Sequence, residues 1–379
     1  MPGPNNSHPT PGSSSQHQQL QLPQPPLKQK MALTLKGLLK RATGGGESTA
    51  ADMADLFTAT QKEVDGEDCD HDCESCHVSY PRGFKIDESD VLYGQVKGWS
   101  THVVVATSKT DWVRSVEDEK GSVMEAFGKA DGPSNGRLML SASNIPTPSH
   151  TCNYSEPTRV LLLPAFTLIE NVTPAAVPSL ISEYINRAPT NTSALAPVSL
   201  PPSLDVAHID TEAAKILARP SPHRAVILLC SQKTRDARCG QSAPILRKEL
   251  ERHLRPLGLF RDLDDERPGG VGIYFISHVG GHKYSANVMV YRRPDAFGVD
   301  SVERAKLGVG EEVRPLVAKK GDGDEEGEDM GAGQCIWLAR VKPEDCENLV
   351  RYTVLQGKVV KPGSQLRGGF DRAKGLFSW

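Results

Sequence analysis

Two pairs of metal-binding residue types lie on separate parts of this sequence. Cys230 and Cys239 form a C-x8-C pattern, and His278 and His282 form an H-x3-H pattern around two glycines. Thiolates are soft, charged ligands, whereas neutral imidazoles suit borderline metals such as zinc and iron. Together the two pairs could supply four ligands to one metal centre.

Each pair follows a predicted strand. Residues 224–230, RAVILLC, form a continuous apolar run that ends in the first cysteine, and 271–277, VGIYFIS, precede the first histidine. Gly280 and Gly281 disfavour a helix between the histidines, so the H-x3-H pair is expected on a loop. If the two strands are parallel neighbours, both loops leave the same edge of the sheet, where α/β proteins build their sites.

The residues alone leave three interpretations open. A structural zinc site is chemically reasonable, but such sites usually use more closely spaced cysteines than C-x8-C. A [2Fe–2S] cluster is larger, so ligands on two separate loops fit it better, and neutral histidines would raise its reduction potential. In the third interpretation the cysteines are core residues, the histidines lie on the surface, and no metal binds.

The surrounding pattern predicts an α/β fold in two domains. Residues 61–190 are assigned to a small N-terminal α/β domain with a cysteine-rich opening segment, 191–205 to a linker, and 206–379 to a second domain with an acidic insert at 318–332. In the first domain we predict strands at 101–107, 137–143 and 159–166 and helices at 115–128 and 173–187. In the second we predict strands at 224–230, 271–277, 285–291 and 334–341 and helices at 240–254 and 343–355. This β-α-β-β-β-α order suits a thioredoxin-like domain, and no internal repeat is evident.

The beginning of the chain has a different composition. Residues 1–60 are predicted to be a disordered tail, because the opening stretch is rich in Pro, Gln, Ser and His. A short basic amphipathic stretch starts at Met31. It predicts a surface helix or, if translation begins there, a mitochondrial presequence.

Composition excludes several classes of function. The 379 residues carry a formal net charge of −3 and no basic stripe with interleaved aromatics, so nucleic-acid binding is unsupported. No apolar run is long enough to span a membrane. With eight cysteines and no signal-peptide pattern, we expect reduced cysteines and a cytoplasmic protein.

The combination of C-x8-C with H-V-G-G-H-K resembles the sucrase/ferredoxin-like family, whose domains are similar to thioredoxin-like [2Fe–2S] ferredoxins. The resemblance includes the stretch GWSTHVVVATSKTDW at 98–112 and extends from residue 65 to the end. It implies that Cys230 and Cys239 hold one iron of a [2Fe–2S] cluster and that His278 and His282 hold the other.

The resemblance implies an electron-transfer protein in redox or iron homeostasis, with an unidentified redox partner protein. Gly280 and Gly281 would let the backbone approach the cluster. An imidazole on iron keeps its second nitrogen free to titrate, so electron uptake is expected to couple to proton uptake. No substrate pocket is evident, so an enzymatic role is left open.

The cysteine-rich segment DCDHDCESCH, residues 68–77, offers a second site. Cys69, Cys73 and Cys76 could bind an ancillary metal, with the nearby histidines, or provide a thiol pair. Two alternative functions follow from the two sets of residues. They are a thiol–disulfide oxidoreductase that uses these cysteines, and a structural zinc-binding interaction module.

The sequence ends in LFSW. A terminal tryptophan after serine resembles the tail signal by which cytosolic iron–sulfur proteins are recognised for cluster insertion. Trp379 is therefore predicted to bind the cytosolic iron–sulfur assembly machinery.

Overall fold

A computed structural model of the chain describes residues 50–205, 215–298 and 329–379. Met31, most of the predicted tail and most of the acidic insert lie outside the described residues. The described chain is a mixed α/β unit built on one large sheet, which confirms the predicted α/β class. The predicted tail extends to residue 60, whereas Leu56 and Phe57 are core residues with 0% and 2% of their surface exposed.

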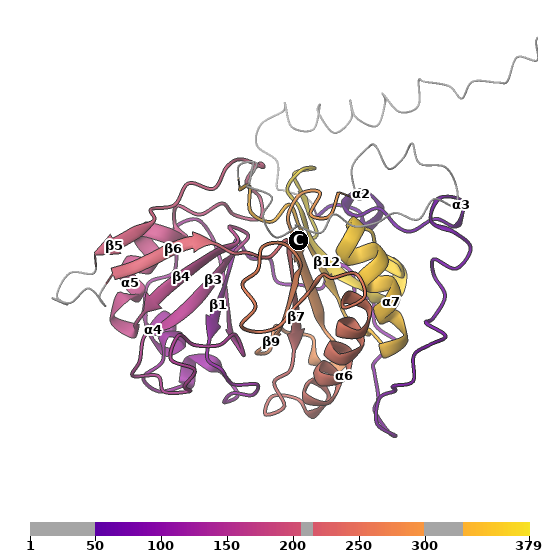
Figure 1. Ribbon diagram of the computed structural model, residues 1–379, viewed down its shortest axis with the longest axis horizontal. Helices are drawn as coiled ribbons and strands as arrows, with labels where there is room; N and C mark the ends of the chain where they lie inside the picture. The colour runs from indigo at the N-terminus through magenta and orange to yellow at the C-terminus, as the bar shows by residue number, and fades with distance from the viewer. Residues whose placement is uncertain (1–49, 206–214, 299–328) are drawn as a thin grey trace, which may run out of the picture. The chain divides into compact units, whose positions relative to one another are not determined.

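The first half of the sheet lies between residues 101 and 220 (Figure 1). Its strands are β1 (Thr101–Ala106), β2 (Leu138–Ser143), β3 (Thr158–Leu163), β4 (Thr167–Val172), β5 (Ser203–Asp205) and β6 (Lys215–Pro220). Its helical segments are η1 (Val116–Asp118), α4 (Val123–Lys129), η2 (Pro174–Ala176), α5 (Val177–Leu180) and the π-helix η3 (Ile181–Ile185). The strand order is β2-β1-β3-β4-β6-β5, with β2 parallel to β1 and the other pairs antiparallel.

The second half of the sheet follows from residue 225. Its strands are β7 (Ala225–Cys230), β8 (Phe260–Arg261), β9 (Val271–Ile276), β10 (Val288–Arg292), β11 (Gln334–Leu338), β12 (Leu366–Asp371) and β13 (Leu376–Phe377). Its helical segments are α6 (Ala237–Leu254), η5 (His282–Tyr284), η7 (Pro343–Asp345), α7 (Cys346–Asn348), the π-helix η8 (Leu349–Val354) and α8 (Pro362–Gln365). Two short helices, α2 (Met53–Leu56) and α3 (Lys62–Asp65), precede both halves. The strand order is β9-β7-β10-β11-β12-β13.

The two halves repeat one layout that the sequence did not reveal. In the first half, β1 pairs in parallel with β2 and antiparallel with β3, and β4 pairs antiparallel with β3. In the second half, β7 pairs in parallel with β9 and antiparallel with β10, and β11 pairs antiparallel with β10. After that fourth strand, each half forms a helical segment that starts with a proline and continues as a π-helix. The structure therefore contains the same β-α-β-β-β-α arrangement twice.

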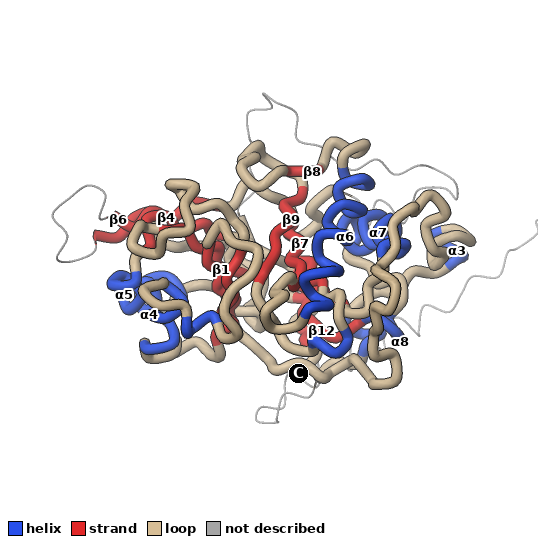
Figure 2. The backbone as a smooth tube through the Cα atoms, turned by 90° about the horizontal axis from the view of Figure 1, so that it is seen from below, coloured by secondary structure: helices blue, strands red, loops and turns tan. Residues whose placement is uncertain are grey.

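Successive apolar side chains of a strand face opposite sides of the sheet, so the sheet has a core on each face. On β7, Ile227 and Leu229 face the core that contains α6 and α7, while Val226 and Leu228 face a core shared with the first half. A strand with apolar residues on both faces is expected to be covered on both faces. Figures 1 and 2 show α4 and α5 beside the strands of the first half and α6 and α7 beside those of the second.

The halves join at the edges where β2 and β9 meet. Their ladder contains a single registered pair, Ser143 with Ile276. Buried contacts extend this junction, because His102 on β1 lies 3.0 Å from the hydroxyl of Tyr291 on β10. The predicted domain boundary falls in the connection that leads to β5, and β6 still pairs with β4 of the first half.

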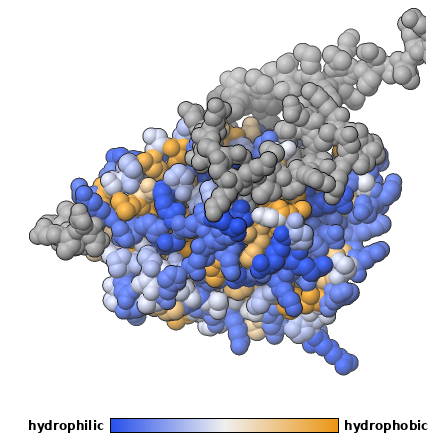
Figure 3. Space-filling model, in the orientation of Figure 1, coloured by the Kyte–Doolittle hydropathy of each residue, from blue (hydrophilic) through white to orange (hydrophobic). Residues whose placement is uncertain are grey.

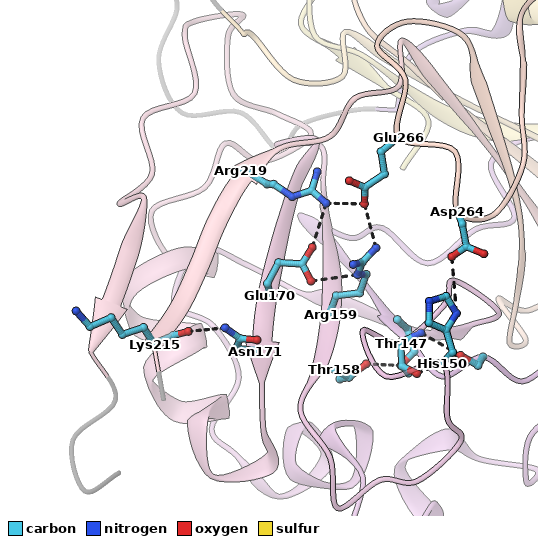
Figure 4. Close-up of polar contacts among 12 residues, drawn as sticks. Thr147, His150, Thr158, Arg159, Glu170, Asn171, Lys215, Arg219, Asp264 and Glu266 are labelled. Atoms are coloured by element: carbon cyan, nitrogen blue, oxygen red, sulfur yellow. Dashed lines mark hydrogen bonds and ion pairs between the residues drawn. The ribbon is translucent and has the colours of Figure 1, made fainter. Parts of the chain in front are cut away.

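Charged side chains also cross between the halves. Arg219 on β6 donates to Glu170 on β4 at 3.2 Å and to Glu266 of the second half at 2.7 Å, and Arg159 on β3 contacts both carboxylates (Figure 4). His150 and Asp264 form a further exposed pair across the same boundary, at 3.9 Å. Because these groups are partly exposed, their contribution to stability is small.

The described surface carries few large apolar side chains. Figure 3 shows one face that is largely hydrophilic, with hydrophobic residues in scattered patches. The exposed large hydrophobic residues are Val64, Val91, Val113 and Leu217. Among the described helices none is long and apolar enough to cross a membrane.

Candidate metal centre

The two ligand loops leave the same edge of the sheet. Strands β7 and β9 are parallel neighbours, and their last residues, Cys230 and Ile276, are paired in register. The condition set out from the sequence, that the two strands are parallel neighbours, is therefore met. The loop after β7 leads to Cys239, and the loop after β9 carries both histidines.

Three of the four predicted ligands form one group. The ligand atoms of Cys230, Cys239 and His278 all lie within 4.8 Å of one another. Both cysteines are buried, with 1% and 0% exposure. Helix α6 begins at Ala237, earlier than the predicted residue 240, so Cys239 lies in its first turn. The positive end of the helix dipole there favours negative charge on a nearby sulfur.

The histidines continue this group toward the surface. His278 lies with Nδ1 3.9 Å from Cys230 Sγ and Nε2 3.4 Å from Nδ1 of His282. His282 begins η5 and is exposed, and it is outside the group of three. The structure thus brings all four residues into one neighbourhood, with a buried sulfur end and an exposed imidazole end.

The two buried thiols lie close enough to influence each other's protonation. The neighbouring Cys239 thiol and His278 lower the pKa of Cys230, although burial opposes this. The proximity of Cys230, together with burial, raises the pKa of Cys239. One thiolate and one thiol are therefore favoured in this buried pair, which is a ready source of anionic sulfur for a cation.

Gln232 fixes the cysteine loop to the histidine loop. Its side-chain oxygen accepts from the backbone N–H of His278 at 2.9 Å, and its amide donates to the carbonyl of Val113 at 2.5 Å. Thr234 adds two hydrogen bonds to Asp111, at 3.0 and 2.7 Å. The loop after β1 of the first half therefore supports the ligand loop of the second.

The two glycines have different roles. Both have positive φ, 91° at Gly280 and 66° at Gly281, which a side chain would strain. A Cβ on Gly281 would also lie 2.5 Å from the guanidinium of Arg367, whereas one on Gly280 would meet no atom within 4 Å. The turn therefore needs glycine for its conformation at both positions and for space at the second.

Arg367 on β12 is the residue that sequence reasoning missed. It is 3% exposed, donates to the carbonyl of Gly280 at 3.1 Å and to Asn287 at 2.7 Å, and lies 4.4 Å above the ring of Trp337. Burial lowers its pKa to about 10, and its Nε is buried without a hydrogen-bond partner. The segment LRGGF offered no signal for a cation beneath the histidine loop.

The sucrase/ferredoxin-like family model matches residues 92–368, which is most of the chain. The chain belongs to the sucrase/ferredoxin-like family.

Relatives that the chain matches include fungal proteins. The chain is 30% identical to actin patches distal protein 1 of Saccharomyces cerevisiae over 60% of its own length and 71% of that protein. It is 26% identical to altered inheritance of mitochondria protein 32 of Clavispora lusitaniae, over 41% of this chain and 39% of the relative. No solved structure matches the chain significantly.

The family match leaves two predicted features outside it. The resemblance was expected from residue 65, but the match starts at residue 92, after the cysteine-rich segment. Cys69 is buried, and Cys73 and Cys76 are half-buried. Cys73 lies within 4.8 Å of His253 and Glu347 rather than in a group with the other two cysteines.

Trp379, also beyond the match, packs against the fold. Its ring lies 4.4 Å from that of Trp99, and Ser378 beside it is fully buried and bonded to Gly369. In this structure the tryptophan is a packed, half-buried residue.

Two side chains beside the ligand loops are already held by polar contacts. Arg238 is bound by Asp236, with Nη2 2.8 Å from a carboxylate oxygen. Tyr284 is 6% exposed, and its hydroxyl donates to Asp90 at 3.1 Å. Tyr284 is therefore a packed residue beneath the loop, with its polar end already bonded.

Proposed function

We propose that this chain transfers single electrons through a [2Fe–2S] cluster held by Cys230, Cys239, His278 and His282. The observation that carries the proposal is the convergence of two cysteines and a histidine within 4.8 Å, with the second histidine in contact with the first. Membership of the sucrase/ferredoxin-like family supports the same assignment.

The residues present fit such a group. The sulfur end is buried and favours a thiolate, Arg367 supplies a buried positive charge, and its Nε offers an N–H without an acceptor. The strand order of the second half supports the thioredoxin-like layout implied by the resemblance. When bound, the cluster would supply a one-electron carrier whose potential is raised by the two neutral imidazoles.

The protein's own residues determine orientation and access. Gln232 fixes the backbone at His278, and Arg367 fixes the turn at Gly280. The buried cysteines exclude water from the sulfur end. The exposed His282 is the point at which solvent can deliver a proton to the histidine end and at which a partner protein can approach.

The partner is proposed to be an acidic redox protein. Lys233 and Arg235 lie on the cysteine loop, Arg238 lies in the first turn of α6, and Lys283 follows the exposed histidine. Lys283 is paired with Asp90 and Arg238 with Asp236, so Lys233 and Arg235 carry most of the attraction. We propose a cytoplasmic location, with a mitochondrial one as the alternative favoured by the name of the Clavispora lusitaniae relative.

Recognition of Trp379 by the cytosolic iron–sulfur assembly machinery remains part of the proposal. Because the indole packs on Trp99, recognition would require the last residues to leave that position. A W379A variant is expected to contain less iron when produced in cells, but to take up a full cluster when reconstituted with iron and sulfide. Equal iron in both preparations would contradict this role.

Structural zinc is the second candidate, because a compact Cys-Cys-His group also suits zinc. The deciding experiment is iron and zinc analysis with a visible spectrum on protein purified without oxygen. About two irons per chain and bands that bleach on dithionite support electron transfer. No iron, no colour and one zinc that is lost in Cys239→Ser would establish a structural module instead. A role as a thiol–disulfide oxidoreductase would require disulfide turnover that Cys73→Ser or Cys76→Ser abolishes.

A further inference from the structure

A second group of metal-ligand side chains lies at the far end of helix α6. Cys73 comes from the cysteine-rich segment, His253 from the last turn of α6, and Glu347 from α7. One ligand atom from each lies within 4.8 Å of the others, with Cys73 Sγ 4.0 Å from His253 Nε2. Along a helix, residues 239 and 253 are about 21 Å apart, so this group is separate from the candidate cluster.

The group already surrounds a positive charge. Nη2 of Arg252 lies 3.5 Å from Cys73 Sγ and 3.0 Å from His253 Nε2, so one guanidinium nitrogen bridges the sulfur and the imidazole. The same side chain is anchored by the buried Glu249 at 2.9 Å and by Ser75 at 3.0 Å. Because a guanidinium only donates, His253 Nε2 presents its lone pair toward this position.

We propose that Cys73, His253 and Glu347 bind Zn²⁺ or a similar borderline divalent cation at the position that the Arg252 guanidinium occupies. One thiolate, one imidazole and one carboxylate are a common zinc donor set, and water would complete the tetrahedron. Arg252 can turn outward on its flexible stem while it keeps its ion pair with Glu249. Binding releases the thiol proton of Cys73 to solvent.

A metal bound here would attach the irregular segment 66–100 to the helices of the second half. Residues 66–100 contain no helix or strand. Individual hydrogen bonds tie this segment to the helical layer, such as Cys73 N–H to the carbonyl of Glu344 and Asn348 to the carbonyl of His71. A metal bound by three elements would join the segment to α6 and α7 at one point.

Zinc titration of the full chain tests the proposal, followed by zinc-edge X-ray absorption, which does not detect iron. We expect one zinc per chain, with one sulfur at about 2.3 Å and nitrogen or oxygen at about 2.0–2.1 Å. Cys73→Ser and His253→Gln should weaken binding by at least the ten- to hundredfold seen when even an outer partner of a ligand is lost. Glu347→Gln should weaken it less.

The matched controls are neighbours of the same type. Cys76→Ser removes the next cysteine of the segment and should leave zinc affinity unchanged, and Arg252→Gln, which removes the competing charge but can still donate to Glu249, should tighten binding. Far-UV circular dichroism and a thermal melt show that each variant folds. A zinc shell without sulfur, a shell with two sulfurs that Cys76→Ser disrupts, unchanged affinity in Cys73→Ser, or weaker binding in Arg252→Gln would each overturn the proposal.

Discussion

The two halves of the sheet share one layout, yet only the second carries the ligand pairs. The central strand of the first half, β1, ends at Ala106, whereas the central strand of the second half, β7, ends at Cys230. At the first edge, Thr107 donates to the carbonyl of Ser143 at 2.7 Å and accepts from the indole of Trp112 at 2.9 Å. Hydrogen bonds within the first half thus satisfy the groups at its edge, whereas the second half presents sulfur and imidazole.

The comparison shows that the strand layout does not by itself determine whether a half carries metal-ligand residues. Both edges meet at the β2–β9 junction, and Asn144, the first residue after β2, exchanges hydrogen bonds with the backbone of Phe275 on β9. The loop after β1 holds Gln232 and Thr234 of the cysteine loop. The first half supports the cysteine loop of the second, and the residues at and just after the strand ends give the second half alone a Cys-Cys-His group at this edge that could hold a metal.

Among the predicted effects on the difference between the two halves, the largest should be the loss of iron binding when a cysteine ligand is removed. Cys239→Ser is expected to abolish iron binding, because a serine hydroxyl does not replace a buried thiolate toward iron. Iron content and visible absorbance give the measurement. Cys152→Ser, an exposed cysteine of the first half, is the control and should keep both. Full iron in Cys239→Ser would place the cluster elsewhere.

Conversion of a histidine to cysteine should change the potential while the cluster stays bound. His282→Cys or His278→Cys adds a negative ligand, so the reduction potential should fall by on the order of 100 mV per substitution. The pH dependence of the potential should weaken in the same variants, since one titratable imidazole is lost. Redox titration with EPR detection measures both. An unshifted or higher potential would remove the histidine assignment.

The charge of Arg367 should contribute a smaller shift. Arg367→Met removes a buried cation that contacts the histidine turn, so the potential is expected to fall by some tens of millivolts, roughly what a partly screened charge contributes. Arg367→Lys keeps the charge and should restore most of the wild-type value. Equal potentials in Met and Lys variants would mean that packing rather than charge matters.

Acid should destabilise the fold through two buried histidines near the junction of the halves. Burial lowers the pKa of His102 to about 3 and that of His223 to about 4, whereas an unfolded histidine titrates near about 6.5. Between these values the unfolded chain binds protons that the folded chain does not. The free energy of unfolding should therefore fall as the pH drops from about 6.5 toward 4, by roughly 1.4 kcal/mol per pH unit and per histidine.

Denaturant melts across that range measure the slope. His102→Gln can still bond to Tyr291 and Ser141 but does not titrate, so its slope should be smaller by one histidine. A slope equal to that of the wild type would show that His102 does not control the acid sensitivity.

Much of the ligand edge was predictable from the sequence, because continuous apolar runs such as RAVILLC mark strands buried on both faces. The longer strands β4, β6 and β12 were missed, as were the short strands β5, β8 and β13. Strand β12 contains Gly368 and Gly369, which lack strand propensity, and β6 ends in a proline. Their places depend on pairing with distant strands, which no local pattern encodes. The same applies to Arg367, His253 and Glu347, which reach their sites only through the tertiary fold.

The packing of Trp379 on Trp99 also gives the molecule an optical property. The ring centroids of Trp99 and Trp337 lie 5.6 Å apart in an edge-to-face contact, so three of the four tryptophans form one cluster that includes the last residue. Arg367 connects that cluster to the histidine turn. The intrinsic fluorescence of this chain therefore reports on the assembly of the halves, and quenching by a coloured centre at the turn would follow its loading without any added dye.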